Sequence, residues 1–339
     1  MANHPFNLPV KLLCHSDTLE AYRQLGDCWP FFMEVNLTSK CNLRCNWCIS
    51  GNFQRKASLG LMEFSNFVSE FAGLGGKGLT FSGGGEPTLH PDFTYFAGLG
   101  VDSGLDLGLI TNGTYSQDKQ LAVDKYFKWV RISLDTIDYE EYKRWKGVDI
   151  LDRVLHNILS HNGPSKLAIN VNIGMQHTIS SVENLILLLK DFVDIIQFRP
   201  ILPRYYCQEK IEINDKVWDY LEDNWLGNPK IVFSLDKFSD LKTMEWPFKK
   251  CTGHHFAPIL DSNGDICVCM YHPGDERFVF GNIYEQSFSQ IWLGAKRQQV
   301  LKFISQLDYC KECQLSCKLT EMNKILDTIA SPTADINFV

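Results

Sequence analysis

Six short runs of apolar or alternating residues recur along the chain, and stretches with helical periodicity separate them. Side chains in a strand point alternately to its two faces, so the pattern predicts strands at residues 31–37, 77–83, 105–111, 129–135, 167–174 and 194–200. Apolar residues at three- and four-residue spacing predict amphipathic helices at 58–75, 116–127, 136–147, 151–162 and 181–192. Strands that alternate with helices indicate parallel βαβ units and therefore an α/β fold.

This periodicity fits either a doubly wound sheet or a partial barrel, and both place their chemistry at the carboxyl ends of the strands. The residues suited to chemistry fall at those ends. A cysteine cluster follows the first strand, the segment GGGE follows the second, TNG follows the third, and Asp135 closes the fourth. We therefore expect one common site at this edge of the sheet.

The composition changes along the chain. We predict an N-terminal extension over residues 1–30, a core over 31–200, a bridging segment over 201–250 and a cysteine-rich module over 251–339. The bridging segment mixes aromatic and charged residues without a cysteine cluster, whereas cysteines recur after it. Metal ligands would stabilise such a small module, because a short chain buries little apolar surface.

The balance of charge narrows the class of ligand. The 339 residues are 45% hydrophobic and 22% charged, enough for a sizeable core, and the net charge is -7. Nucleic acids are bound mainly by clustered lysine and arginine, so we expect a small molecule or a peptide instead. The N-terminus lacks the pattern of a secretory signal, and no apolar run has membrane-spanning length. A cytoplasmic protein without a membrane partner is expected.

The twelve cysteines, in a reducing compartment, indicate metal ligands rather than disulfides. Cys41, Cys45 and Cys48 have the spacing C-x-x-x-C-x-x-C in a loop after the first strand. Structural zinc usually takes four protein ligands, whereas three thiolates can hold a cubane iron–sulfur cluster that leaves one iron open. The odd number of thiols favours the cluster. The alternatives are a zinc site completed by a remote residue and buried thiols that bind no metal.

With Trp47 directly before the third cysteine, this loop resembles the signature of the radical S-adenosylmethionine (SAM) superfamily, and the resemblance extends through most of the chain. It implies a partial (β/α)6 TIM-type barrel, a catalytic [4Fe–4S] cluster on Cys41, Cys45 and Cys48, and SAM bound to the open iron. It also implies that an electron from the cluster cleaves SAM to a 5′-deoxyadenosyl radical, which abstracts a hydrogen from the substrate. A flavodoxin- or ferredoxin-type protein would donate the electron.

The resemblance also gives expected roles to residues around SAM. Gly84, Gly85 and Glu86 match the segment that holds the methionine amino group, and Arg144 resembles a basic residue near the SAM carboxylate. A helix-surface charge would fit Arg144 equally, and turns or half-buried strands would explain the short polar residues at strand ends. The predicted cofactor-binding residues are Trp47, Gly84, Gly85, Glu86, Asn112, Ser133, Asp135, Arg144 and Asn172. Substrate contact or a structural ion pair would explain Gln197 and Arg199, which close the sixth strand.

The segment from Cys251 to Cys317 resembles the auxiliary-cluster extensions called SPASM and twitch domains. Its opening element is a cysteine followed by G-x-x-x-x-C, and a C-x-x-C pair follows later. A full SPASM pattern has seven cysteines for two clusters, so the resemblance favours the twitch form with one auxiliary [4Fe–4S] cluster. The predicted ligands are Cys251, Cys269, Cys310 and Cys313, with Cys267 and Cys317 as possible alternates. Without the first motif, a zinc ribbon would be favoured here.

Three hypotheses for the function remain open. The leading one is hydrogen abstraction from a small metabolite, such as a sugar, an aminocyclitol or a nucleotide-linked intermediate, followed by oxidation, epimerisation or rearrangement. The first alternative is modification of a ribosomally synthesised peptide, which usually calls for an extra N-terminal domain, and we expect no room for one before the first strand. The second alternative is a non-catalytic, zinc-structured scaffold.

Overall fold

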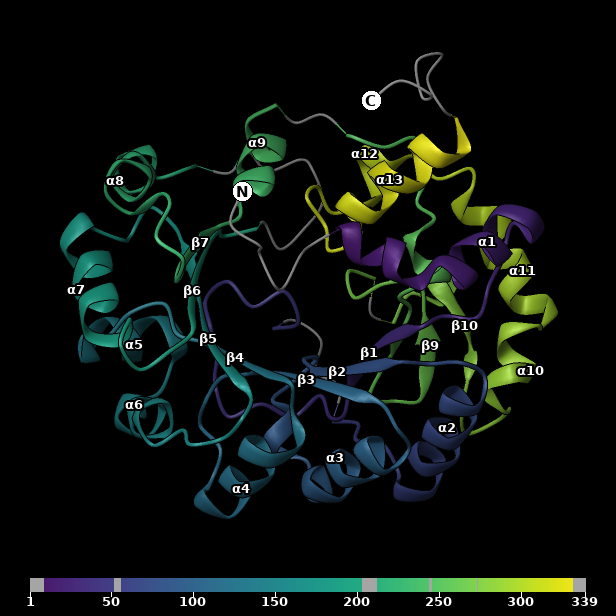
Figure 1. Ribbon diagram of the computed structural model, residues 1–339, viewed down its shortest axis with the longest axis horizontal. Coiled ribbons are helices and arrows are strands. Elements are labelled where there is room, and N and C mark those ends of the chain that lie inside the picture. Colours follow the sequence, from purple (N-terminus) through teal and green to yellow (C-terminus); the bar gives the residue numbers. More distant parts are fainter. Residues whose placement is uncertain (1–8, 52–55, 203–211, 244–245, 273, 332–339) are drawn as a thin grey trace.

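The computed structural model describes residues 9–51, 56–202, 212–243, 246–272 and 274–331 (Figure 1). One sheet of ten strands runs through these residues in the order β10-β9-β8-β1-β2-β3-β4-β5-β6-β7. The six predicted strands form its centre, and each pairs in parallel with the next. They are β1 (Phe32–Asn36), β2 (Gly78–Ser82), β3 (Asp106–Thr111), β4 (Trp129–Ser133), β5 (Lys166–Ile173) and β6 (Ile195–Pro200).

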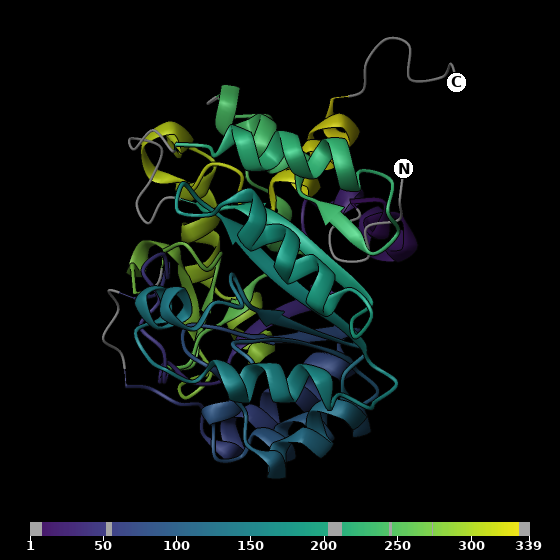
Figure 2. The same cartoon turned by 90° about the vertical axis from the view of Figure 1, so that its left-hand side faces the viewer.

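The helices that connect these strands lie on the outer side of the curved sheet (Figures 1 and 2). A doubly wound sheet would carry helices on both faces, so this arrangement is that of an open, partial barrel. The outer helices are α2 (Leu61–Gly73), α3 (Phe93–Asp102), α4 (Gln117–Tyr126), α5 (Tyr139–Lys146), α6 (Leu151–Leu159), α7 (Ile179–Leu189) and α8 (Asp215–Trp225).

The hydrophobic core lies between the sheet and the outer helices. Phe64 of α2 packs edge-on against Phe81 of β2, with ring centroids 6.1 Å apart, and both side chains are fully buried. Burying one large apolar side chain contributes roughly 2–3 kcal/mol, so this layer fixes α2 firmly on the sheet. The other face of each strand is left to line the barrel interior.

Strand β4 shows how the sequence separates the two faces. Val130 and Ile132 point outward into the core and are completely buried. Trp129, Arg131 and Ser133 point to the opposite side and line the interior, because successive side chains of a strand face opposite ways. Alternation along the strand therefore gives the interior its polar lining.

The segment at 201–250, expected to bridge two parts, contributes to the barrel. Within its described residues, α8 is followed by β7 (Ile231–Phe233) and α9 (Leu235–Thr243). Strand β7 pairs in parallel with β6, with Ile196 opposite Ile231. The segment thus adds a seventh strand to the parallel part of the sheet.

The cysteine-rich segment extends the same sheet at its other end. Strand β8 (Ile259–Leu260) pairs in parallel with β1, and β9 (Asp265–Cys267) and β10 (Val279–Asn282) continue the sheet in antiparallel fashion. The turn between β8 and β9 contains Gly264, whose φ of 90° suits glycine. Helices α10 (Phe288–Trp292), α11 (Ala295–Ile304), α12 (Tyr309–Glu312) and α13 (Thr320–Ala330) follow.

This segment shares the main hydrophobic core rather than depending on metal ligands alone. Phe288 of α10 packs against Phe67 of α2 at a centroid distance of 5.5 Å. Glu70 of α2 accepts hydrogen bonds from the backbone N–H groups of Phe288 and Ser289, at 2.7 and 3.0 Å. The first turn of α10 is therefore capped by a residue more than two hundred positions earlier. No helix in the described parts of the chain has the length and apolarity needed to cross a membrane.

Candidate active site

The loop after β1 carries the three predicted cluster ligands, and two other parts of the chain hold it in place. Cys41, Cys45 and Cys48 all line one cavity. The backbone N–H groups of Arg44 and Asn46 donate to the carbonyls of Lys146 and Trp145, at 2.8 and 3.0 Å, in and beside the last turn of α5. Carbonyls at a helix C-terminus have no partner within the helix, so they are available for this contact.

The close approach of the glycine segment after β2 to this loop requires a residue without a side chain. The Glu86 N–H donates to the carbonyl of Lys40 at 2.8 Å. A Cβ atom on Gly85 would lie 2.6 Å from the carbonyl carbon of Ser39 and 2.7 Å from that of Lys40. Gly84 has room instead, since its Cβ would meet no protein atom closer than 3.7 Å. Gly85 therefore serves packing, and Gly84 leaves open space toward the cavity.

The Glu86 carboxylate is buried and joins the ends of β2 and β3. It accepts hydrogen bonds from the Thr88 N–H (3.1 Å) and hydroxyl (2.6 Å), the Thr111 hydroxyl (2.6 Å) and the Asn112 N–H (2.7 Å). Burial raises the pKa of Glu86, and these four donors oppose the rise. The side chain does not line the cavity. Its predicted contact with SAM stays a prediction, and its visible role is to position the neighbouring loops.

Asn112 connects the third strand end to the cluster loop. Its amide nitrogen donates to the Asn42 side-chain oxygen at 2.9 Å and lies 4.0 Å from the Cys41 sulfur. Its oxygen accepts from the Thr114 N–H at 2.9 Å. This side chain lies beside the predicted ligand Cys41, and hydrogen bonds to a ligand sulfur tune the electron affinity of a cluster.

At the fourth strand end, Asp135 forms a buried ion pair with Lys146 of α5. Asp135 also accepts from the backbone N–H of Asn172 at 2.7 Å and from its side-chain amide at 3.2 Å. Lys146 and Asn172 line the cavity, whereas Asp135 lies behind them. Arg144 is exposed and outside the lining, because residues two apart on a helix face nearly opposite ways. The basic side chain that α5 presents to the cavity is thus Lys146.

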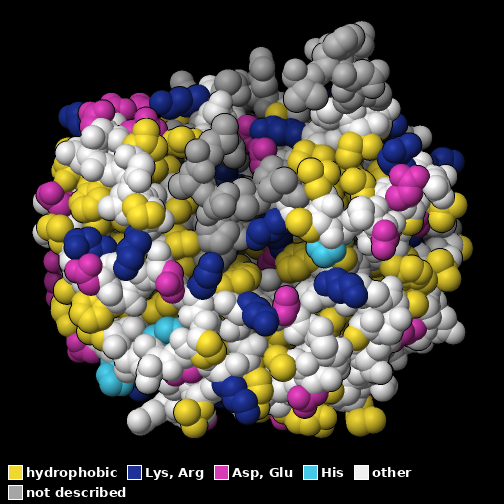
Figure 3. Space-filling model, viewed as in Figure 1, with side chains coloured by type: hydrophobic (Ala, Val, Ile, Leu, Met, Phe, Trp, Pro, Cys, Tyr) yellow, Lys and Arg dark blue, Asp and Glu magenta, His cyan; other side chains and the backbone are white. Residues whose placement is uncertain are grey.

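The described residues line an open cavity of about 1500 Å³ in the barrel interior. Figure 3 shows lysine and arginine side chains around a hollow at the centre of the face that it draws. The lining includes five of the nine predicted cofactor-binding residues: Trp47, Gly84, Gly85, Ser133 and Asn172. Gln197 and Arg199 also line it. The cavity therefore brings the ends of separate strands together, as the sequence predicts.

The thiols of the first loop suit an iron–sulfur cluster. Burial raises the pKa of Cys45 to about 11, with nearby Lys146 acting in the opposite direction, and burial also raises the pKa of Cys41. Iron would supply the positive charge that stabilises the thiolates. Within the described residues, no three His, Cys, Asp or Glu side chains are arranged to hold a single metal ion. A cubane cluster needs its thiols farther apart than tetrahedral zinc does, and three thiolates can hold one that leaves a single iron open.

A second group of thiols lies in the cysteine-rich segment. Burial raises the pKa of Cys251 strongly, and the neighbouring Cys317 and Cys269 raise it further. Burial raises the pKa of Cys269 to about 12, and Cys317 contributes here too. The hydroxyl of Tyr309 accepts from the Cys251 N–H at 2.9 Å, and Cys313 lies close enough to raise the pKa of that tyrosine. Cys251, Cys269 and Cys317 thus form a group of thiols within electrostatic reach of one another, and Cys313 lies near Tyr309.

The other two cysteines of this segment lie differently. Cys267 is buried on β9, and its sulfur lies 3.9 Å from the Asp265 carbonyl oxygen. Cys310 is exposed. The structure therefore brings the possible alternate Cys317 into the group of thiols and places the predicted ligand Cys310 at the surface. The ligand role of Cys310 stays a prediction.

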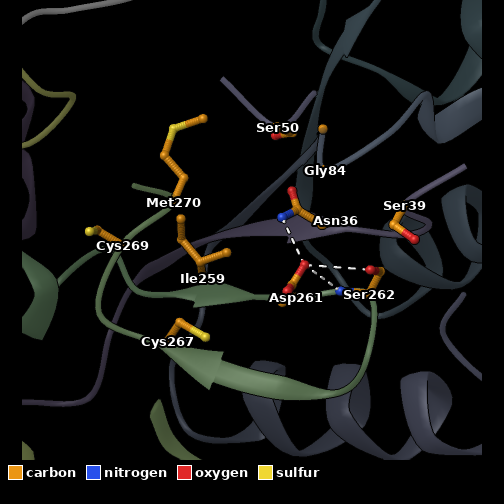
Figure 4. A pocket seen from close by; sticks show the side chains of 11 residues that line it. Asn36, Ser39, Ser50, Gly84, Ile259, Asp261, Ser262, Cys267, Cys269 and Met270 are labelled. Atoms are coloured by element: carbon orange, nitrogen blue, oxygen red, sulfur yellow. Dashed lines mark hydrogen bonds between the residues drawn. The ribbon is translucent and has the colours of Figure 1, made fainter. Parts of the chain in front are cut away.

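A small pocket lies between the two thiol-bearing regions (Figure 4). Gly84 and Ser50 line one side, and Cys269 and Met270 line another. Below them, the Asn36 amide donates to Asp261 at 3.2 Å. The end of β1 thus contacts the cysteine-rich segment, and residues next to both groups of thiols line this pocket.

Several residues that line the cavity belong to no sequence motif that would identify them. Lys146, Arg131, Lys237 and Lys318 all line the interior, yet each lies on a segment where a surface charge would look the same. Strand alternation could have placed Arg131 beside Ser133 on the inner face. For Lys237 and Lys318, which follow β7 and the last cysteine, only the folded structure shows their position.

Comparison with known proteins gives two family matches. The Radical SAM superfamily matches residues 35–189, and the SPASM family, an iron–sulfur cluster-binding domain, matches residues 251–317. A curated GTP 3′,8-cyclase of Haemophilus influenzae (strain PittEE) is 21% identical over 318 residues, which cover 86% of this chain and 90% of the relative. A GTP 3′,8-cyclase of Pasteurella multocida (strain Pm70) is also 21% identical and covers 87% and 92%.

A solved structure of Streptococcus suis SuiB bound to SAM has a TM-score of 0.65 at 17% identity, and covers 92% of this chain and 76% of that chain. The protein called anSMEcpe, with bound SAM, has a TM-score of 0.60 at 18% identity and covers 87% and 88%. At these identities the likeness is one of fold.

Proposed function

From the premise that this chain belongs to the radical SAM superfamily and carries a C-terminal SPASM domain, we propose that it abstracts a hydrogen atom from a small metabolite bound in the barrel cavity. The chain is an enzyme of this superfamily, and its two domains imply iron–sulfur clusters. The observation that carries the proposal is the cavity of about 1500 Å³, because the three cysteines of the first loop and the polar inner faces of β4, β5 and β6 all line it.

We assign the first cluster to Cys41, Cys45 and Cys48. When bound there, the cluster and SAM supply a 5′-deoxyadenosyl radical in the superfamily reaction. The protein's own residues orient and enclose the reactants: Gly84 leaves space for a ligand near the main chain, and Asn172, fixed by Asp135, presents its side chain to the cavity. Exclusion of water by the bound reactants would protect a radical from side reactions.

A nucleotide-linked metabolite is the substrate class that the relatives favour. The GTP 3′,8-cyclases align over most of both chains, although identity is about one residue in five. Oxidation, epimerisation, rearrangement or cyclisation of such a compound would all begin with the same hydrogen abstraction. The electron would come from a flavodoxin- or ferredoxin-type protein, and the cytoplasm provides the reducing conditions that both clusters require.

For the auxiliary cluster we propose Cys251, Cys269, Cys313 and Cys317 as ligands. The mutual influence of three of these thiols, and the position of Cys313 near Tyr309, support this set. Four ligands would complete one [4Fe–4S] cluster.

The test uses anaerobically reconstituted protein, reduced in the presence of SAM. The wild type is expected to bind about eight iron atoms, as two cubanes would, and to form 5′-deoxyadenosine. The triple variant Cys41→Ala, Cys45→Ala, Cys48→Ala should keep about four irons and form none. Cys14→Ala, which changes an exposed cysteine outside both groups, is the matched control and should behave as the wild type. Formation of 5′-deoxyadenosine by the triple variant would refute the assignment.

A peptide is the second candidate substrate, because SuiB has also been solved with its precursor peptide SuiA, at a TM-score of 0.66 and 17% identity. Deuterium transfer distinguishes the two candidates. Turnover with candidate nucleotides, or with peptides encoded near the gene, should place deuterium in 5′-deoxyadenosine only when the labelled compound is the substrate.

A further inference from the structure

The cavity has the opposite charge to the chain as a whole. The whole protein has a net charge of -7. Among the described residues, the side chains that line the cavity include ten lysines and arginines but three carboxylates, Glu34, Asp106 and Glu321. Positive charge therefore outweighs negative charge along this cavity, and a cavity with this balance attracts anions.

Some of these lysine side chains form ion pairs or hydrogen bonds within the protein. Lys146 pairs with the buried Asp135, and Lys128 lies 3.5 Å from Asp106. Lys237 donates to the Ser316 carbonyl and lies near the thiol of Cys317, in the auxiliary group. Such cations would balance protein carboxylates or a thiolate-bound cluster.

Arg131 and Arg199 differ from these cations. They extend from the inner faces of β4 and β6, on either side of β5, and Arg131 donates to the side chain of Gln197 at 3.4 Å. Burial, together with repulsion by Arg199, lowers the pKa of Arg131 to about 9. The carboxylate that acts on both arginines is Glu34, which already forms an ion pair with Lys318. Among the described groups, Glu34 therefore acts on three cations.

SAM does not account for this excess. SAM carries an ammonium and a sulfonium against one carboxylate, so it adds positive charge to the cavity. Among the described groups, Arg199 and Glu34 shift the pKa of Arg131, and Tyr271 and Glu34 shift the pKa of Arg199. Two like charges held together in a protein interior are costly unless an anion joins them.

We propose that Arg131 and Arg199 bind a phosphate or diphosphate group of the substrate, so that the enzyme acts on a phosphorylated small molecule. The guanidinium group presents several N–H donors in one plane, which matches the oxygens of phosphate. A group with two or more negative charges fits the excess better than a single carboxylate does. The inference rests on the proposed function, since it assumes that the substrate occupies this cavity.

The test measures binding of inorganic pyrophosphate to the reconstituted, SAM-bound protein by isothermal titration calorimetry. Loss of one charge-assisted contact in Arg131→Gln or Arg199→Gln should weaken pyrophosphate binding by about tenfold or more. Arg153→Gln changes an exposed arginine on α6 outside the cavity and should leave the affinity within about twofold. Iron content and thermal denaturation show whether each variant folds, and Arg199→Gln, at a half-buried position, carries the test if Arg131→Gln does not fold.

No binding by the wild type, or equal binding by wild type and both arginine variants, would overturn the proposal. A changed electron paramagnetic resonance spectrum of the auxiliary cluster in Arg199→Gln with unchanged pyrophosphate binding would do so as well, because that arginine would then serve the cluster. Displacement of pyrophosphate by GTP supports a nucleotide, and displacement by ribose 5-phosphate alone supports a sugar phosphate. The wild type's reductive cleavage of SAM is assayed separately, so failure of the proposed function is told apart from failure of the phosphate site.

Discussion

Replacing Gly85 by alanine is expected to damage the cluster loop without touching any cysteine. The new Cβ would lie 2.6–2.7 Å from the carbonyl carbons of Ser39 and Lys40, whereas carbon atoms pack at about 3.5 Å or more, so the two segments must separate by about 1 Å. Overpacking of this kind costs about 1–3 kcal/mol, and the hydrogen bond from Glu86 to Lys40, 2.8 Å long, would add about 1 kcal/mol if lost.

A loss of about 2–4 kcal/mol corresponds to a fall in Tm of about 3–6 °C for a chain of this length. Circular dichroism melts of the metal-free protein would measure it, and iron analysis after reconstitution should show reduced occupancy of the first cluster. Gly84→Ala is the matched control: its Cβ meets no protein atom within 3.7 Å, so Tm and iron content should be unchanged while SAM binds more weakly. A Tm within about 1 °C of the wild type together with full iron occupancy in Gly85→Ala would refute the reasoning.

Two further predictions concern other parts of the site. Cys317→Ala should remove the auxiliary cluster's electron paramagnetic resonance signal, whereas Cys310→Ala should keep it; the reverse result would restore Cys310 as the ligand. Asp135→Asn leaves the buried Lys146 ammonium without its carboxylate and should destabilise the protein by about 3–5 kcal/mol in urea denaturation. Because the folded state raises the pKa of Lys146, the stability from this pair is present at neutral pH and should decline only above about pH 10.5. A loss below pH 9 would contradict this account.

The sequence predicts the central strands well because their pattern is strong. All six predicted strands are present, and their ends differ from the predicted ends by at most two residues. Apolar runs that are buried on the helix side and polar on the inner side leave little choice of register. Gly84, Ser133 and Asn172, at or near the carboxyl ends of three of these strands, line one cavity for the same topological reason, whereas Asn112 and Asp135 lie outside its lining.

Other elements could not be predicted because tertiary contacts determine them. Helix α3 contains Gly98 and Gly100, which disfavour a helix in isolation. A Cβ on Gly100 would meet Leu107 at 2.9 Å, so glycine allows α3 to pack closely on β3. Strands β7 to β10 have two to four residues each, too few to show a period.

The sequence predicts those residues of the site that belong to a recognisable motif. It does not predict the residues whose role depends on the direction in which the folded chain points their side chains. The three cysteines of the first loop share one cavity, as expected. On α5 the sequence offers both Arg144 and Lys146, and only the folded helix shows that Lys146 faces inward. Spacing likewise does not tell which late cysteine approaches Cys251, because the turns between them set the direction of each thiol.

The most direct test of the account is electron–nuclear double resonance on the reduced protein with SAM labelled with ¹⁵N at its amino group and ¹³C at its carboxylate. If Cys41, Cys45 and Cys48 hold a cluster with one iron open, both labels should show hyperfine coupling to it, and the couplings should vanish in the triple alanine variant. Absence of coupling in wild-type protein that binds SAM would contradict the account.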